Sequence, residues 1–176
     1  AAAARLDVDG ALSRGYADLR DRVVFTIDPD DARDFDDAVS LETDETGARH
    51  VGVHIADVSA YVVWDSALDQ DARERATSVY AVDRVIPMLP EELSADLCSL
   101  RPGEDRLCMT VDMTIDAAAR VTAARIYPAV MRSRARLTYD EAQAIIDGTG
   151  EAVSVPPEVA SRILALHEVA EARVDL

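Results

Sequence analysis

The sequence predicts a single domain of the α/β class (α+β in the narrower sense), with a mixed but mostly antiparallel sheet flanked by helices. Apolar and polar residues alternate in two segments, 51–56 and 108–115, which is the period of half-buried strands. Helix-start signals at Thr138 and Pro156 precede apolar residues at helical spacing. The 176 residues, 49% of them hydrophobic, are enough to enclose one core.

Three strands are predicted in the first third of the chain, where segments are rich in β-branched residues or alternate in polarity. These segments are 23–27, 38–42 and 51–56. The polar segment 43–48, which contains Gly47, predicts a turn between the last two. Together they predict a small sheet with residues 28–37 in a loop at one end.

The middle of the chain predicts a helix, an extended connector and a hairpin. Ser66 is a suitable N-cap, and apolar residues at helical spacing follow it as far as Val79. Pro87 interrupts regular structure, so an extended connector is expected there. The strands of the hairpin are expected at 108–115 and 121–130.

Two helices are predicted at the C-terminal end. Thr138 and Glu141 have the spacing of a capping box, and the helix that they start is expected to end at Gly148. Pro156 and Pro157 open a last helix with an apolar stripe on one face.

Composition limits the class of protein. No apolar run reaches the roughly 18 residues of a membrane span, and no signal sequence opens the chain, so a cytoplasmic protein without a membrane partner is expected. Cys98 and Cys108 lack a CxxC spacing and a histidine partner, so free thiols are expected and zinc is not. The net charge of −16 argues against nucleic-acid binding unless a cation or another domain offsets it.

Six aspartates lie between residues 28 and 37, directly after a predicted strand. Carboxylates this close repel one another, so an ordered chain that keeps them is expected to bind a cation. Carboxylate oxygens are hard ligands that suit Mg²⁺, with Mn²⁺ and Ca²⁺ as alternatives. An EF-hand loop does not fit in either register, because Arg33 or Val39 would stand where that loop needs glycine.

The same cluster suits phosphodiester hydrolysis. A divalent cation lowers the pKa of a water ligand, and a second ion about 4 Å away stabilises the leaving oxygen. Two such ions carry four positive charges, which three or four carboxylates balance. Two other interpretations stay open on the residues alone, a solvated acidic loop without chemistry and a calcium-binding structural loop.

Three further side chains are assigned by position. His54 is expected to be a strand residue whose ring is hydrogen-bonded. Asp57 follows a strand and is a candidate to support the aspartate loop. Trp64 is expected to contribute to packing.

Seven ordered segments carry a resemblance to a known family. They are 26–29, 32–38, 53–59, 77–80, 83–94, 97–100 and 136–139. Together they resemble the RNB catalytic domain, the domain of ribonuclease II, ribonuclease R and the eukaryotic exosome exonuclease. The resemblance begins at about Arg22 and implies a lead-in segment at 1–21, then the N-terminal part of an RNB fold at 22–176.

The resemblance implies a magnesium-dependent 3′→5′ exoribonuclease that hydrolyses single-stranded RNA to nucleoside 5′-monophosphates. It implies that four aspartates are both the metal ligands and the catalytic residues. These are Asp28, Asp34, Asp36 and Asp37. The resemblance also implies that Asp36 is the one most critical for the chemistry and that Tyr80 stacks on the 3′-terminal base. The remaining two, Asp30 and Asp31, are expected to be bystanders.

A full RNB domain is considerably longer than this chain. Its back half carries an arginine and a glutamate near the active site, and neither can be located here. The remaining half of the domain and oligonucleotide-binding domains are therefore expected partners besides RNA. The alternative function is a non-catalytic fragment or binding module that binds metal, RNA or a partner chain without turnover.

Overall fold

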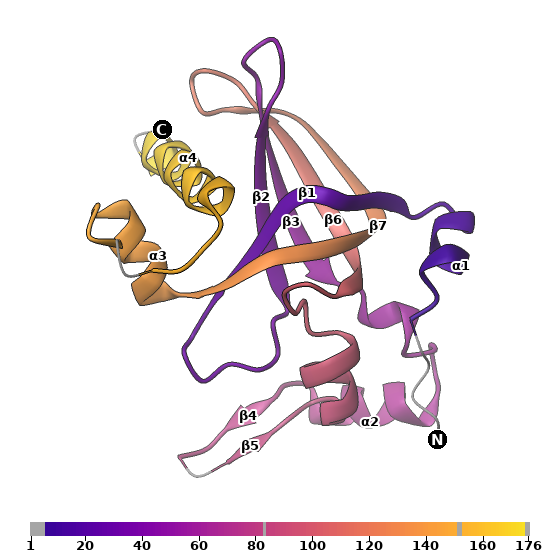
Figure 1. Ribbon diagram of the computed structural model, residues 1–176. Coiled ribbons are helices and arrows are strands. Elements are labelled where there is room, and N and C mark those ends of the chain that lie inside the picture. The colour runs from indigo at the N-terminus through magenta and orange to yellow at the C-terminus, as the bar shows by residue number, and fades with distance from the viewer. Residues whose placement is uncertain (1–5, 83, 151–152, 175–176) are drawn as a thin grey trace.

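Five strands form a closed barrel in the computed structural model, which describes residues 6–82, 84–150 and 153–174 (Figure 1). They are β1 (Ala17–Asp28), β2 (Asp37–Thr43), β3 (Arg49–Ala56), β6 (Asp105–Ile115) and β7 (Val121–Thr138). Neighbours in the order β1-β2-β3-β6-β7 are antiparallel, and β7 then pairs with β1 in parallel. The predicted mixed, mostly antiparallel sheet is confirmed, although its closure into a barrel was not predicted.

The pairing of β1 with β7, which closes the barrel, is irregular. The pairing of β1 with β7 shifts register between Leu19 and Val24 and again before Phe25. Such irregularities bend a strand and increase its twist. The bent strand pairs with β7 along most of its length, and with β2 at Val24 and Phe25. As a result, β7 continues to Thr138, well past the predicted end at residue 130, because its second half is a partner for β1.

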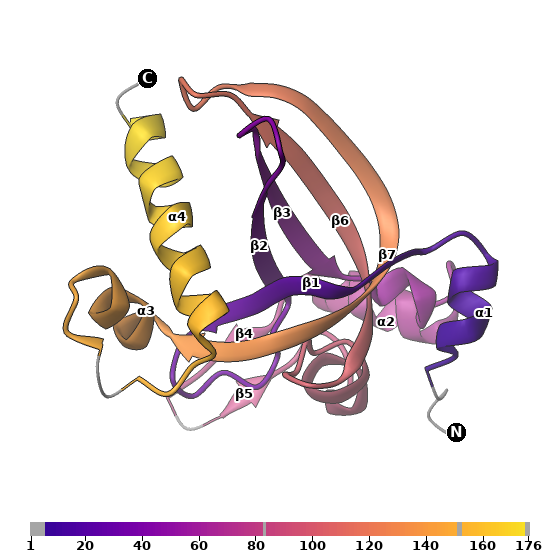
Figure 2. The same ribbon diagram turned by 45° about the horizontal axis from the view of Figure 1, so that its top comes forward.

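The helices flank the barrel. They are α1 (Val8–Ser13), α2 (Ala67–Arg75), α3 (Tyr139–Ile146) and α4 (Pro157–Val174), with a 3₁₀ turn η1 (Val58–Ala60) and a π-helical turn η2 (Leu93–Leu97). Figure 2 shows α4 beside β1 and β2, with α1 on the opposite flank. Val159 and Ile163 of α4 pack against Phe25 and Leu137, which seals the outer side of the barrel there.

Two predicted helices behave differently. The capping box is confirmed, because Thr138 Oγ1 accepts from the Glu141 backbone N–H and the Glu141 carboxylate accepts from the Thr138 N–H. The helix that starts after Ser66 ends at Arg75, earlier than predicted, because Ala76 adopts a left-handed conformation with φ of 63°. Val79 therefore lies in the short strand β4 (Val79–Tyr80), which pairs with β5 (Val85–Ile86).

Trp64 does not pack in a core, so that expectation was wrong. Its side chain is 80% exposed, and the Arg73 guanidinium lies 4.6 Å from the centre of its ring. Cys98 and Cys108 are both free and buried, as expected. Within the described ranges, no helix has the length and apolar character needed to cross a membrane.

His54 is completely buried inside the barrel, and both of its ring nitrogens have a partner. Its Nε2 lies 2.9 Å from Ser40 Oγ, and its Nδ1 lies 2.9 Å from Thr110 Oγ1. Gly52 leaves room for the ring, since a Cβ there would lie 2.8 Å from His54 Nε2. Burial, followed by the charge of Arg22, lowers the pKa of His54 to about 4. The ring is therefore neutral near pH 7. The expectation of a strand residue with a hydrogen-bonded ring is confirmed.

We expect the stability of the fold to fall between pH 6.5 and pH 4 through His54. The unfolded chain takes up the proton near pH 6.5, whereas the folded chain does so only near pH 4, so acid favours unfolding. The shift corresponds to about 3 kcal/mol of lost stability once both states are protonated. Urea unfolding at pH 7.5 and pH 5 measures the part of this loss that occurs above pH 5, which is about 2 kcal/mol.

The variant His54→Gln should lose less stability than the wild type over that interval, whatever its stability at pH 7.5. The matched control is His167→Gln, a half-exposed position on α4, which should keep the wild-type loss. Equal losses in wild type and His54→Gln would exclude His54 as the cause.

Candidate metal site at the end of strand β1

The barrel places the predicted metal ligands at one end of the β1–β2 pair. Asp28 is the last residue of β1 and Asp37 is the first residue of β2. Asp34 and Asp36 lie in the connecting loop, residues 29–36, which we call the aspartate loop. In Figure 1 this loop extends from the barrel on the side where the β4–β5 hairpin lies.

Backbone contacts from distant parts of the chain hold the aspartate loop. The Ala56 N–H donates to the Asp36 carbonyl at 2.8 Å, and the Leu100 N–H donates to the Phe35 carbonyl at 2.9 Å. The Arg136 guanidinium, from β7, donates to the carbonyls of Pro29 and Asp30, and it lies 5.6 Å from the centre of the Phe35 ring. The loop is thus fixed from β3, from β7 and from the segment after η2.

The Asp28 carboxylate is buried without full compensation. The residue is 8% exposed, and its Oδ2 has no hydrogen-bond partner among the described residues. Burial raises the pKa of Asp28, and the charges of Asp37 and Asp34 raise it further, while the Thr26 hydroxyl and Arg136 oppose the shift. A buried carboxylate oxygen without a partner is costly, which favours a bound cation.

Asp36 is subject to the same forces. Asp36 is exposed, unlike Asp28, but the protein around its carboxylate removes part of its water and raises its pKa, and the charges of Asp34, Asp37 and Asp28 add to the effect in that order. Each of the other three carboxylates is therefore close enough to repel it. The structure brings the four aspartates to one edge of the barrel. Their carboxylates repel one another there when no cation is bound.

The donor chemistry at this edge fits a divalent cation. Carboxylates are hard ligands, and the unpartnered Asp28 oxygen provides a position for one bond. Within the described part of the chain, however, no three His, Cys, Asp or Glu side chains are close enough together to hold a metal ion. The four aspartates share one edge without closing around a common point.

Tyr80, in β4, reaches the aspartate loop from the hairpin. Its hydroxyl donates to Asp34 Oδ2 at 3.3 Å, while 69% of the residue remains exposed. The charge of Asp34, followed by burial and the hydrogen bond itself, raises the pKa of the Tyr80 hydroxyl. The structure thus brings together an exposed aromatic ring and the predicted metal ligands, which lie far apart in the sequence.

The hydrogen bonds of the Asp57 carboxylate come from residues other than those of the aspartate loop. Its carboxylate accepts from the Tyr16 hydroxyl at 2.8 Å and from Ser59 Oγ at 2.6 Å. Asp30 and Asp31 are exposed, and the Asp30 carbonyl accepts from Arg136. The residues that sequence reasoning missed are Arg136 and Ser99, which contact the aspartate loop from elements distant in sequence.

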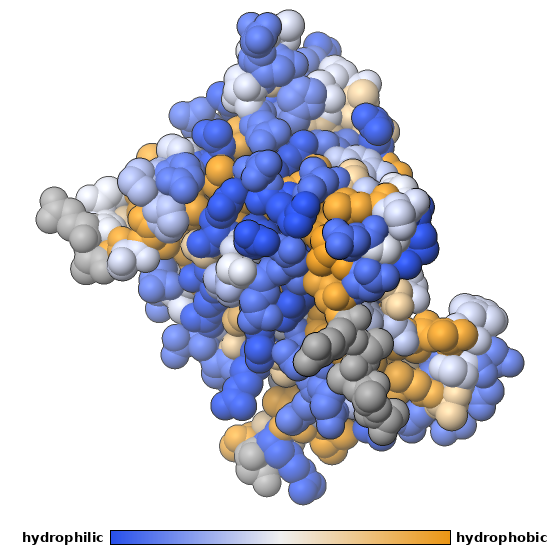
Figure 3. Space-filling model, turned by 45° about the vertical axis from the view of Figure 1, so that its right-hand side comes forward, coloured by the Kyte–Doolittle hydropathy of each residue, from blue (hydrophilic) through white to orange (hydrophobic). Residues whose placement is uncertain are grey.

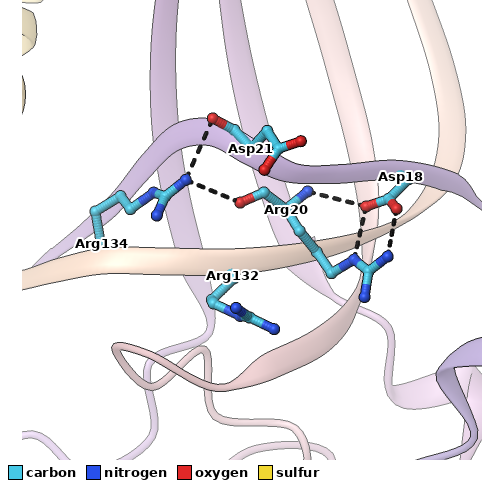
Figure 4. Close-up of a pocket in the computed structure, with 5 residues that line it drawn as sticks. All are labelled: Asp18, Arg20, Asp21, Arg132 and Arg134. Atoms are coloured by element: carbon cyan, nitrogen blue, oxygen red, sulfur yellow. Dashed lines mark hydrogen bonds and ion pairs between the residues drawn. The ribbon is translucent and has the colours of Figure 1, made fainter.

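A polar hollow, separate from the aspartates, lies along the part of β1 that is at least seven residues before Asp28. It has a volume of about 160 Å³ and is lined by Asp18, Arg20, Asp21, Arg132 and Arg134 (Figure 4). Aspartates pair with the guanidinium groups of Arg20 and Arg132, and backbone carbonyls accept from that of Arg134. Two of the three guanidinium groups are thus already paired with carboxylates, and the third is bound to backbone carbonyls. Figure 3 shows a mainly hydrophilic face with separate hydrophobic patches.

Comparison with known proteins gives a consistent result. The family model of the RNB domain matches residues 16–175. A ribonuclease R from Thermotoga maritima is 52% identical over 133 residues, which cover 76% of this chain and 19% of that protein. The chain therefore spans about a fifth of the length of this curated relative.

Solved structures have the same fold. Mycoplasma genitalium RNase R in complex with double-stranded RNA matches with a TM-score of 0.90 at 30% identity, covering 96% of this chain and 30% of that chain. Yeast Ssd1, described as a pseudonuclease, matches with a TM-score of 0.76 at 19% identity over 95% of this chain and 20% of that one. The second match concerns the fold alone.

We expect Asp28→Asn to change how the fold responds to Mg²⁺. The folded pKa of Asp28 is raised, so its ionised form costs stability near neutral pH, and the amide removes that cost. Without divalent cations the variant should be at least as stable as the wild type. With saturating Mg²⁺, the wild type should gain in melting temperature and the variant should gain less, because a ligand that binds the folded state stabilises it.

Thermal unfolding followed by circular dichroism, with and without Mg²⁺, measures both effects. Asp31→Asn removes the same charge from the same loop at an exposed position and should behave like the wild type. The same Mg²⁺ gain in all three proteins would argue against Asp28 as a ligand.

Proposed function

Since this chain belongs to the RNB domain family, we propose that it is the N-terminal part of the catalytic domain of a metal-dependent 3′→5′ exoribonuclease. The proposed reaction is hydrolysis of single-stranded RNA to nucleoside 5′-monophosphates. The proposed location of the protein is the cytoplasm. The observation that carries it is the gathering of four aspartates beside the exposed ring of Tyr80. A carboxylate cluster next to an aromatic platform matches the needs of a nuclease that acts at a strand end.

The four aspartates are the proposed ligands of Mg²⁺, with Mn²⁺ as an alternative. Bound cations of this kind supply a nucleophile near neutral pH and stabilise the charge on the leaving oxygen. Asp28 offers an unpartnered oxygen from a rigid strand end. Asp36 is held through its carbonyl by Ala56. Arg136 stays on the backbone side of the loop, where it fixes the carbonyls of Pro29 and Asp30.

Tyr80 is the proposed stacking partner of the terminal base. Its ring is exposed while its hydroxyl is anchored to Asp34, so a stacked base would lie beside the metal ligands. Stacking on an aromatic face tolerates any base, which suits degradation without sequence preference.

RNA binding by this part is expected to depend on the rest of the protein. The chain carries a net charge of −16, and phosphate binding needs basic groups. The remaining half of the domain and oligonucleotide-binding domains are the proposed source of those groups, and the relatives are much longer than this chain.

The alternative is a non-catalytic fragment or binding module that binds metal, RNA or a partner chain without turnover. One observation favours it: the carboxylates of the described residues do not close around one point. A gel shift with RNA, next to a turnover assay on this 176-residue chain, separates the two. Binding without cleavage supports the alternative for the chain alone.

We expect the full-length parent protein to release labelled 5′-monophosphates from single-stranded RNA with Mg²⁺ and to stop on addition of EDTA. Asp36→Asn should lower the rate by at least about 100-fold, because even groups that only orient metal ligands contribute 10–100-fold. Asp31→Asn serves as the control and should keep the wild-type rate. Activity that survives EDTA or Asp36→Asn would refute the proposal.

We expect Tyr80→Ala to weaken the binding of single-stranded RNA by about 5- to 100-fold, the contribution of one stacked base. Fluorescence anisotropy on the full-length parent, made inactive by Asp36→Asn, measures the dissociation constant. Tyr80→Phe keeps the ring and should bind nearly as well as tyrosine. Equal losses in both variants would assign the effect to the hydroxyl and not to stacking.

A further inference from the structure

Ser99 makes two hydrogen bonds to the aspartate loop, one on each side of Asp34. The Ser99 hydroxyl donates to the Arg33 carbonyl at 2.8 Å and accepts from the Phe35 N–H at 3.1 Å. Ser99 itself is completely buried. The two peptide groups that flank Asp34 are therefore both fixed by one side chain, 64 or more residues away in sequence.

The next residue strengthens this attachment. The Leu100 N–H donates to the Phe35 carbonyl at 2.9 Å, so both polar groups of Phe35 are bound by consecutive residues. Leu100 is completely buried in the core cluster that contains Val24 of β1, which makes it a rigid support.

Arg106 of β6 fixes the backbone of Ser99. Its Nε donates to the Ser99 carbonyl at 2.8 Å, and its Nη2 donates to the Asp96 carbonyl at 3.2 Å and to the Glu104 carboxylate at 2.6 Å. Arg106 is only 7% exposed, so the desolvated cation depends on these acceptors. Arginine, with its rigid fork of donors, is suited to fixing several backbone oxygens at once.

From these contacts we propose that Ser99 is the positioning residue of the metal ligand Asp34. The inference rests on the proposed function, in which Asp34 binds the cation. Arg106 orients Ser99, Ser99 fixes the peptide groups on both sides of Asp34, and the Asp34 carboxylate in turn accepts from Tyr80. Metal ligand and base-stacking ring thereby share one support.

Serine is suited to this position because its hydroxyl donates and accepts at once in a small volume. Alanine would leave the Arg33 carbonyl and the Phe35 N–H without this partner. Outer groups that orient metal ligands typically change metal affinity by 10–100-fold when removed. The effect expected for Ser99→Ala is therefore on the mobility of the loop and on cation affinity.

The test compares Ser99→Ala with Ser133→Ala in the 176-residue chain. Ser133 is a matched control, since it is also buried and its hydroxyl donates to the Ala135 carbonyl at 2.9 Å, within β7 and not to a residue of the aspartate loop. Hydrogen exchange of peptides covering residues 29–36 reports the loop, and electron paramagnetic resonance with Mn²⁺ alone reports cation affinity.

Ser99→Ala should speed exchange in that peptide about tenfold and weaken Mn²⁺ binding about tenfold, with Ser133→Ala like the wild type. Ser99→Cys, with a weaker donor of similar size, should fall in between and serves if the alanine variant unfolds. Loop exchange unchanged from the wild type, or equal changes in Ser133→Ala, would overturn the inference. Absence of Mn²⁺ binding in the wild type would instead contradict the proposed metal site, and exchange would still decide whether Ser99 holds the loop.

Discussion

Holding several carboxylates together against their mutual repulsion is the constraint on which this arrangement depends. The charges of Asp34, Asp37 and Asp28 all act on Asp36, so the loop that carries them needs an external support. That support is polar and acts on backbone groups of the loop, through the hydroxyl of Ser99 and the guanidinium of Arg136. Neutral hydrogen bonds and one arginine fix the loop, so the aspartates need not be neutralised by ion pairs that would compete with a cation.

The elements of the fold were largely predictable because their signals are local. The capping box at Thr138 and the alternation of residues 108–115 reflect interactions within a few residues or across one hairpin. The closure of the barrel was not predictable in the same way, because it depends on Ala17 pairing with Ala129. The early end of α2 was missed because Ala76, with no glycine signal, adopts a left-handed conformation.

The candidate site divides along the same line. The aspartates were recognised because they are adjacent in sequence, and the resemblance to a family singled out four of them and added Tyr80. Ser99 and Arg136 lie in two of the segments that resemble the family, but those segments do not reveal their role, which exists only once β6, β7 and the loop meet. Sequence reasoning supplied the chemistry of the ligands. It did not supply the contacts that orient them.

The parallel pairing of β1 with β7 joins the first strand of the barrel to the last one that is synthesised. β7 begins only at Val121, so one edge of β1 stays unpaired until the strands between them have been made. Contacts this distant in sequence slow folding, and an open strand edge invites pairing with other chains. That edge of β1 therefore stays open to pairing with other chains until β7 is complete, and the same strand brings Arg136 to the carbonyls of Pro29 and Asp30.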